Sequence, residues 1–155
     1  MLIGVISDTH GLLRPEVFRA FSNVELILHG GDIGSEEVLE GLQTIAPVVA
    51  VRGNNDTAGW AKSIPDTNET QAGRRRIFLI HDLKEMNLNP LTAGFHVVIS
   101  GHSHKPRIDQ HDGVLFVNPG SAGPRRFKLP VTVARLDIKG TRVKAELAEL
   151  IRIQL

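Results

Sequence analysis

Residues 2–10 read LIGVISDTH, an apolar run followed directly by an aspartate and a histidine. An unbroken apolar run of this length is typical of a β-strand that is buried on both faces, as in a parallel sheet. In open α/β sheets, the residues just beyond the carboxyl ends of such strands carry the chemistry. Asp8 and His10 are therefore the first candidates for a functional site.

The same arrangement recurs along the chain. Further apolar runs at 24–28, 48–51, 76–80 and 97–99 are each followed within a few residues by side chains of metal-ligand type. With the first pair they give seven candidate metal ligands: Asp8, His10, Asp32, Asn54, His81, His102 and His104. The chain contains no cysteine, so any metal would be held by nitrogen and oxygen atoms.

Two helices are predicted in the first third of the chain. Pro15 suits a first helical position, which predicts a helix over 14–21. Ser35 is expected to cap a second helix, because Glu36 and Glu37 suit its positive end and apolar residues follow at helical spacing until Pro47. Strands alternating with helices predict a parallel sheet with right-handed crossovers.

The second half of the sequence is less regular. Ala72 and Gly73 predict a hairpin turn into the run that ends at residue 80, and Asn89 with Pro90 indicates the start of a short helix. Residues 114–117 form another apolar run before Asn118. Residues 131–138 and 142–150 predict an antiparallel pair of strands, although the last segment also fits an amphipathic helix. The pattern as a whole belongs to the α/β class.

Composition limits the functions to consider. With 155 residues, of which 41% are hydrophobic and 23% charged, residues 1–155 are expected to form one domain. A net charge of +1 gives no overall field for holding nucleic acid, so no stable nucleic-acid partner is expected. The first apolar segment is too short for a signal peptide or a membrane span, which favours a cytoplasmic protein without a membrane partner.

The order of the polar motifs is more specific than any one of them. Asp-x-His, Gly-Asp, Gly-Asn, His and Gly-His-x-His follow one another along the chain. This order resembles the calcineurin-like metallophosphoesterase superfamily. The length and the Asn-Pro-Gly-Ser segment at 118–121 are most similar to the small single-domain phosphodiesterases of bacteria and archaea. The resemblance implies a four-layer α/β/β/α sandwich of two mixed sheets flanked by helices.

The resemblance also implies a dinuclear metal site. Asp8, His10 and His104 would hold one divalent ion, while Asn54, His81 and His102 would hold the other. Asp32 would bridge the two, because a shared carboxylate offsets the repulsion between neighbouring cations. This donor set suits manganese, iron, nickel, zinc or cobalt better than calcium. Among the compatible ions, which also include magnesium, we expect manganese.

The chemistry implied by the resemblance is hydrolysis of P–O bonds by a hydroxide that bridges the metals. Asp32, Asn54 and Asn55 would be the catalytic residues. Many members of the superfamily have a histidine where this chain has Asn55, and asparagine cannot deliver a proton to a leaving group. We therefore expect better activity on phosphodiesters with acidic leaving groups. Asp56 could replace the missing acid only if its pKa were raised.

Several polar and aromatic residues have alternative interpretations. Asp82 stands where the superfamily usually has glycine, and it either orients His81 or faces solvent. His29 is expected to be a core or rim histidine, and Trp60 is expected to pack against the core. The cluster Arg74–76 is expected to lie in a solvated turn, and residues 118–121 are expected to support the site.

Two other functions are compatible with the sequence. A member of this superfamily with an impaired metal site acts as a protein-interaction scaffold, so the fold alone does not establish catalysis. The substrate could also be a phosphomonoester or a nucleic-acid end instead of a small phosphodiester. The intact set of seven ligand-type residues favours an enzyme, and the sequence is also compatible with a homo-oligomer.

Overall fold

Two five-stranded mixed sheets make up most of the chain in the computed structural model, which describes residues 1–126 and 128–151. The first sheet has the strand order β10-β9-β1-β2-β3. Its strands are β1 (Leu2–Ile6), β2 (Leu26–His29), β3 (Val48–Ala50), β9 (Val131–Lys139) and β10 (Arg142–Ile151). The second sheet has the order β4-β5-β6-β8-β7. Its strands are β4 (Thr67–Ala72), β5 (Arg75–Ile80), β6 (Val97–Ile99), β7 (Arg107–His111) and β8 (Val114–Asn118).

Each sheet contains three adjacent parallel strands. In the first sheet β1 pairs with β2 and β2 with β3, all parallel. In the second sheet β5, β6 and β8 are parallel in the same way. The strands β4, β7, β9 and β10 pair antiparallel with their neighbours. Three carboxyl ends in each sheet are therefore available to carry loops toward one site.

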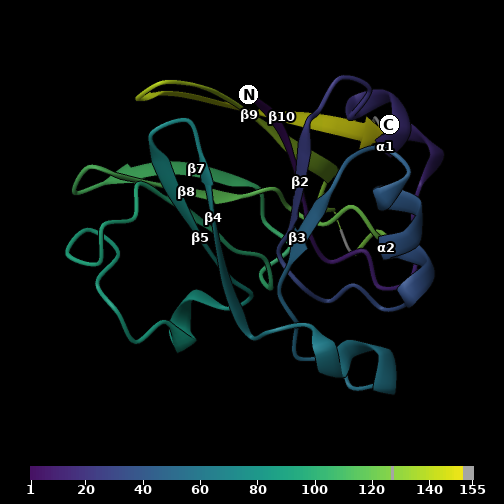
Figure 1. Cartoon of the computed structure of the whole chain (residues 1–155). Helices are drawn as coiled ribbons and strands as arrows, with labels where there is room; N and C mark the ends of the chain where they lie inside the picture. Colours follow the sequence, from purple (N-terminus) through teal and green to yellow (C-terminus); the bar gives the residue numbers. More distant parts are fainter. Residues whose placement is uncertain (127, 152–155) are drawn as a thin grey trace.

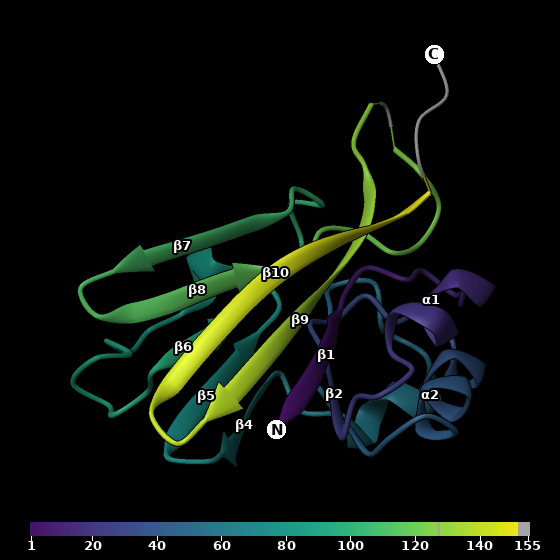
Figure 2. The same cartoon turned by 90° about the horizontal axis from the view of Figure 1, so that it is seen from above.

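The main core lies between the two sheets. Ile3 and Val5 of β1 meet Leu79 of β5 and Ile99 of β6 there, and all four are fully buried. Alternate residues of β1 point the other way, toward the helices α1 (Pro15–Ala20) and α2 (Glu36–Gln43). Both helices lie on the outer side of the first sheet, away from the second (Figure 1 and Figure 2). The two predicted helices are thus confirmed.

The outer face of the second sheet is covered differently. Phe78, Phe95 and Val114 form a smaller cluster there with side chains from the segment that follows β5, which includes the short 3₁₀ helix η2 (Leu83–Glu85). The predicted two-sheet α/β fold is confirmed, but the covering layer on this side is largely irregular chain. The short helix expected after Asn89 is a turn instead, because the Asn89 side chain accepts the amide of Leu91.

Other local predictions have mixed outcomes. The hairpin at Ala72 joins β4 to β5, and the last two segments are paired strands, which rules out the helix alternative. Ser35 lies at the N-cap position of α2, but its side chain makes no capping hydrogen bond. The predicted solvated turn is wrong for Arg75 and Arg76, because both lie in β5. The Arg76 guanidinium lies 4.4 Å from the centre of the Phe95 ring.

Three elements were not predicted. These are β7 and the two 3₁₀ helices, η1 (Gly59–Ser63) and η2. The sequence of β7 is mostly polar and its residues are largely exposed, so it gives no apolar run. Trp60, in η1, packs against the helix side of the first sheet, as expected. Within the described residues no helix is long and apolar enough to cross a membrane.

Candidate metal centre

The seven predicted ligands lie in loops at the carboxyl ends of parallel strands. Asp8 and His10 follow β1, Asp32 follows β2 and Asn54 follows β3. His81 follows β5, and the pair His102 and His104 follows β6 in the other sheet. The structure brings all seven side chains into one cluster between the two sheets.

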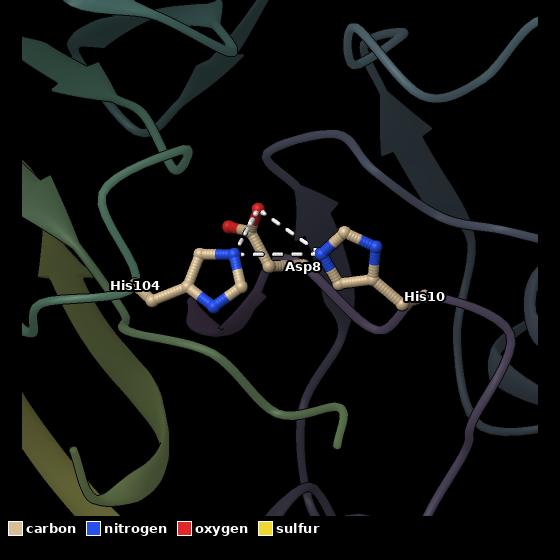
Figure 3. A group of neighbouring side chains, drawn as sticks. All are labelled: Asp8, His10 and His104. Carbon is tan, nitrogen blue, oxygen red and sulfur yellow. Dashed lines mark hydrogen bonds and ion pairs between the residues drawn. The ribbon is translucent and has the colours of Figure 1, made fainter. Parts of the chain in front are cut away.

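Asp8, His10 and His104 form the first group (Figure 3). Asp8 Oδ1 lies 3.3 Å from His104 Nε2 and 3.9 Å from His10 Nε2, and the two histidine nitrogens are 3.4 Å apart. Donor atoms that share an ion at about 2.1 Å are about 3.0–3.4 Å apart. Two of the three distances match this spacing, and the third is slightly longer. The predicted ligands of the first ion are therefore grouped as one ion requires.

Asp32 lies between this group and the remaining ligands. Its Oδ2 is 3.8 Å from His10 Nε2 on one side and 3.4 Å from His81 Nε2 on the other. His81 Nε2 is also 4.0 Å from Asp8 Oδ1, which gives a second cluster of three donors. Asp32 thus occupies the position that a bridging carboxylate needs.

Asn54 and His102 complete the second half of the centre. Asn54 Oδ1 lies 3.3 Å from His102 Nδ1, and the rings of His102 and His81 are 5.2 Å apart, edge to face. Asn54 therefore presents its oxygen, the amide atom able to bind a metal, to a second predicted ligand. His102 is the most exposed of the metal-ligand histidines, so this half of the centre is open to solvent.

Hydrogen bonds engage one polar side-chain atom of Asp8 and one of His81, and they leave the other atom of each side chain for a metal. Asp8 Oδ2 accepts hydrogen bonds from Ser7 Oγ at 2.7 Å and from the His102 amide at 3.1 Å. His81 Nδ1 donates to the Gly30 carbonyl at 2.7 Å, an arrangement typical of metal-binding histidines. Among the described residues, the buried atoms Asp8 Oδ1 and His81 Nε2 have no hydrogen-bond partner. Such atoms are rare and costly, so the donor set fits a divalent cation.

The charges of the centre follow from the same contacts. Burial alone would raise the pKa of Asp32, but the His81 ring 3.4 Å away and the hydrogen bond from the Asn55 amide outweigh burial and hold this pKa far below its usual range. Burial likewise opposes protonation of His81, yet Asp32 and Asp8 raise the pKa of His81 to about 8. The centre therefore combines two ionised carboxylates, Asp8 and Asp32, with four imidazoles, which are donors suited to divalent cations.

The backbone is strained at the ligands themselves. The φ angles are 54° at Asp8, 46° at His10, 54° at Asp32, 71° at His102 and 62° at His104. This left-handed region is unusual for residues with a side chain, and each such residue costs about 1–2 kcal/mol. Close packing between loops adds to the constraint, since a Cβ on Gly53 would lie 2.1 Å from the Asp32 amide nitrogen.

Asp56 has a structural role that the sequence did not indicate. Its buried carboxylate accepts three backbone amides, from Gly53 at 2.9 Å, Gly34 at 3.0 Å and Ile33 at 3.1 Å. It therefore joins the loop after β2 to the loop after β3. Both oxygens of this carboxylate are engaged by backbone amides, so Asp56 is not placed to act as the replacement acid that was considered. The turn residues Gly53 to Asp56 were the only signal for this contact.

His29 is a buried histidine, as expected, and it connects two ligand loops. Its Nδ1 accepts the Gly31 amide at 3.0 Å, so its Nε2 carries the proton and donates to Thr9 Oγ1 at 3.1 Å. The Thr9 hydroxyl donates in turn to the Ile33 carbonyl at 2.7 Å. Complete burial lowers the pKa of His29 to about 4, which keeps the ring neutral.

The neighbours of the ligands include three residues that the sequence had singled out. Asn55 donates its backbone amide to Asp32 Oδ1 at 2.9 Å and its side-chain amide to Asp32 Oδ2 at 3.0 Å. Asn118 donates to the Gly101 carbonyl at 2.9 Å. Ser121 Oγ donates to the Asp8 carbonyl at 3.1 Å, so the 118–121 segment supports two ligand loops.

Asp82 contacts a different histidine from the one considered. Its Oδ2 lies 3.6 Å from His102 Nε2, and its Oδ1 accepts the Lys84 amide at the start of η2. The proposed pairing of Asp82 with His81 is wrong, because His81 Nδ1 is already bound to the Gly30 carbonyl. Asp82 is therefore placed to orient the exposed ligand of the second half-site.

Comparison with known proteins agrees with the fold and the site. Residues 1–141 match the family model of the calcineurin-like phosphoesterase superfamily domain. A probable metallophosphoesterase of Methanothermobacter thermautotrophicus is 41% identical over 160 residues, which cover 95% of this chain and 91% of the relative. The chain belongs to the calcineurin-like phosphoesterase superfamily, a family of metal-dependent hydrolases.

Solved structures show the same fold. A structure described as a novel archaeal phosphodiesterase superposes with a TM-score of 0.77 and 27% identity, covering 96% of this chain and 100% of the other. Vps29 of Chaetomium thermophilum superposes with a TM-score of 0.78 at 21% identity, covering 96% of this chain and 97% of the other. At that identity the likeness to Vps29 concerns the fold alone.

Proposed function

We propose that the protein is a phosphodiesterase that depends on two divalent metal ions, with manganese favoured. The observation that carries this proposal is the position of Asp32. Its carboxylate lies between two groups of donors, and buried donor atoms on both sides of it lack hydrogen-bond partners among the described residues. The archaeal phosphodiesterase with the same fold supports the choice of substrate class.

Each residue of the centre has a defined task in this proposal. Asp8, His10 and His104 would hold one ion, His81, Asn54 and His102 the other, and Asp32 both. Bound there, the ions would supply a hydroxide at neutral pH and offset the charge of the phosphate. Asn55 acts by fixing both oxygens of Asp32, and this leaves its side-chain amide engaged.

None of Asn55, Asp56 and His81 is placed as a proton donor for the leaving group, and the other histidines of the centre would hold metal. Asn55 cannot donate a proton as an acid, and the Asp56 carboxylate is held by three amides. His81 is engaged with Asp32 and with the Gly30 carbonyl. The leaving group must therefore depart as an anion or take a proton from water, which favours substrates with acidic leaving groups.

The proposal is tested by removing all metal and restoring manganese, nickel, zinc or magnesium singly. Hydrolysis of bis(p-nitrophenyl) phosphate and of p-nitrophenyl phosphate is measured in each case. We expect hydrolysis only with metal, and faster hydrolysis of the diester than of the monoester. An Asp32→Asn variant should lose at least about 100-fold in kcat/KM, while Asp137→Asn, the same replacement at a partly exposed aspartate of β9 outside the centre, serves as the matched control. Activity without metal, or full activity of Asp32→Asn, would refute the proposal.

A further inference from the structure

A cavity adjoins the metal centre. It has a volume of about 610 Å³ and lies between η2, the loop after β6 and the strands β7 and β8. His102 lines this cavity as well as the centre, so the two share a wall. Its volume is within the range of small-molecule sites, about 300–1,000 Å³. No task in the hydrolysis described above requires this space.

Apolar side chains line the inner part of the cavity. Leu83 of η2 and Phe116 of β8 are both half-buried members of its wall. Phe116 lies on the outer face of the second sheet, where it packs against the cluster around Phe78 and Phe95. A half-buried aromatic ring in a cavity wall is a surface on which a flat ring can pack.

Cationic side chains line the outer part. Lys84, Lys105 and Arg107 are exposed wall residues, the first from η2 and the other two from the stretch that leads into β7. Arg107 is paired with Asp109. Within residues 1–126 and 128–151, neither Lys84 nor Lys105 forms an ion pair. Two ammonium groups beside an apolar wall are suited to an anion such as phosphate.

The acidic residues of the cavity wall, Asp82 and Asp109, do not neutralise the positive charges of Lys84 and Lys105. Asp82 lies 3.6 Å from His102 Nε2 and also accepts the Lys84 amide, so its carboxylate is directed to the metal side. Asp109 is engaged by Arg107. The cavity therefore combines three features: a metal ligand at one end, an aromatic wall and two available cations.

We propose that this cavity binds the ester arm of a phosphodiester substrate of the nucleotide type. The flat base packs on Phe116, and a second phosphate on the same arm lies near Lys84 and Lys105 while the scissile phosphate is at the metal centre. This inference rests on the proposed function, because it assigns the substrate class of that same site.

The kinetic test uses three substrates with the same leaving group. These are methyl p-nitrophenyl phosphate, thymidine 5′-(p-nitrophenyl phosphate) and the 3′-phosphate of the latter. With the full chain and added manganese, kcat/KM should rise at least about 5-fold from the methyl ester to the thymidine ester, as expected for stacking of one base. The 3′-phosphate should add about 3- to 5-fold, as expected for exposed ion pairs.

Variants assign these gains to the cavity. Lys84→Gln combined with Lys105→Gln should abolish the gain from the 3′-phosphate, and Phe116→Leu should reduce the gain from the base. The matched control is Lys62→Gln combined with Lys144→Gln, two exposed lysines outside the cavity, and it should keep both gains. Equal kcat/KM values for the three substrates, or gains that survive in the cavity variants, would overturn the inference.

A binding measurement separates this inference from the proposed function. Thymidine 3′,5′-bisphosphate is added to the metal-free protein, and amide NMR signals are followed. Shifts concentrated at residues 82–84 and 101–118, and weaker binding to the lysine variant, would support the cavity even if no phosphodiester were hydrolysed. Shifts elsewhere, or none, would overturn the inference even if the methyl ester were hydrolysed normally.

Discussion

His81 Nε2 lies 3.4 Å from Asp32 Oδ2, although the two residues follow strands of different sheets. Asp32 follows β2 of the first sheet and His81 follows β5 of the second. The contact exists only when the apolar faces of the two sheets are packed together. The metal centre therefore depends on the sheet-to-sheet core, and any ion bound there must hold the sheets together.

Metal binding should release a proton from His81. Its pKa is raised to about 8, so the ring is mostly protonated at pH 7 and must lose that proton to bind a metal. The apparent affinity should therefore rise with pH up to about 8. Calorimetry with manganese at pH 7, in buffers of different ionisation enthalpy, should show about one more proton released by the native protein than by His81→Asn. Equal proton counts would contradict this assignment.

His29 should make the metal-free fold sensitive to acid. Burial lowers its pKa from 6.5 to about 4, so the unfolded state binds a proton more readily than the folded state. The free energy of unfolding should therefore fall as the pH falls from about 6.5 to 4. At about 1.4 kcal/mol per pKa unit, the loss is about 3 kcal/mol. Urea titrations at a series of pH values give the free energy of unfolding of the native protein and of His29→Gln. Only the native protein should lose this additional stability as the pH falls from about 6.5 to 4.

Asp82 should affect metal affinity through its charge. Asp82→Asn removes the charge beside His102 while keeping an oxygen that can accept the Lys84 amide. We expect about 10-fold weaker manganese binding in this variant with little change in the free energy of unfolding. Asp82→Ala, which also loses the cap of η2, should show the same affinity loss and a lower stability. If the two variants bind manganese as tightly as the native protein, Asp82 does not orient His102.

Asn55 should make the rate depend strongly on the leaving group. Without a proton donor, kcat should be far lower for a methyl phosphodiester whose leaving group is an alkyl alcohol than for one whose leaving group is a phenol. This holds provided that chemistry limits the rate. An Asn55→His variant should narrow this difference by supplying an acid. The ratio of the two rates is the measurement, because it is unaffected by the fraction of active protein. A native protein that hydrolyses both substrates equally fast would show that a proton donor exists.

Relief of backbone strain should be measurable at His10. Its φ of 46° is readily adopted by glycine and unfavourable for alanine. In the metal-free protein, His10→Gly should therefore be more stable than His10→Ala by about 1 kcal/mol. At a helical site with an ordinary φ, the alanine variant is expected to be the more stable of the two. Gln43→Gly and Gln43→Ala, in α2, provide this control. An alanine variant as stable as the glycine variant at His10 would argue against strain.

The sequence predicted the ligand loops well because the two signals involved are local. An apolar run marks a buried strand, and a polar residue directly after it marks the carboxyl end, as at Asp8 and His81. The grouping of the ligands into two half-sites came from the resemblance to the family. The structure brings the same residues together in one cluster between the two sheets.

The supporting contacts could not be predicted in this way. Asp56 binds the amides of Ile33 and Gly34, which lie 23 and 22 residues away in the sequence, and His29 connects Thr9 with Gly31. Such contacts depend on how loops from different strands meet, which no local pattern encodes. The partner of Asp82 was missed for the same reason, since His102 is close in space but not in sequence. The strand β7 was missed because it is polar and exposed.

The left-handed φ angles have a consequence for any replacement of the ligands. Aspartate and histidine occupy five positions where glycine would relax the backbone. Replacing one of these ligands by glycine would therefore exchange a metal-type donor for a more stable backbone. The five left-handed ligands make the metal-free centre a place where donor chemistry and fold stability oppose each other.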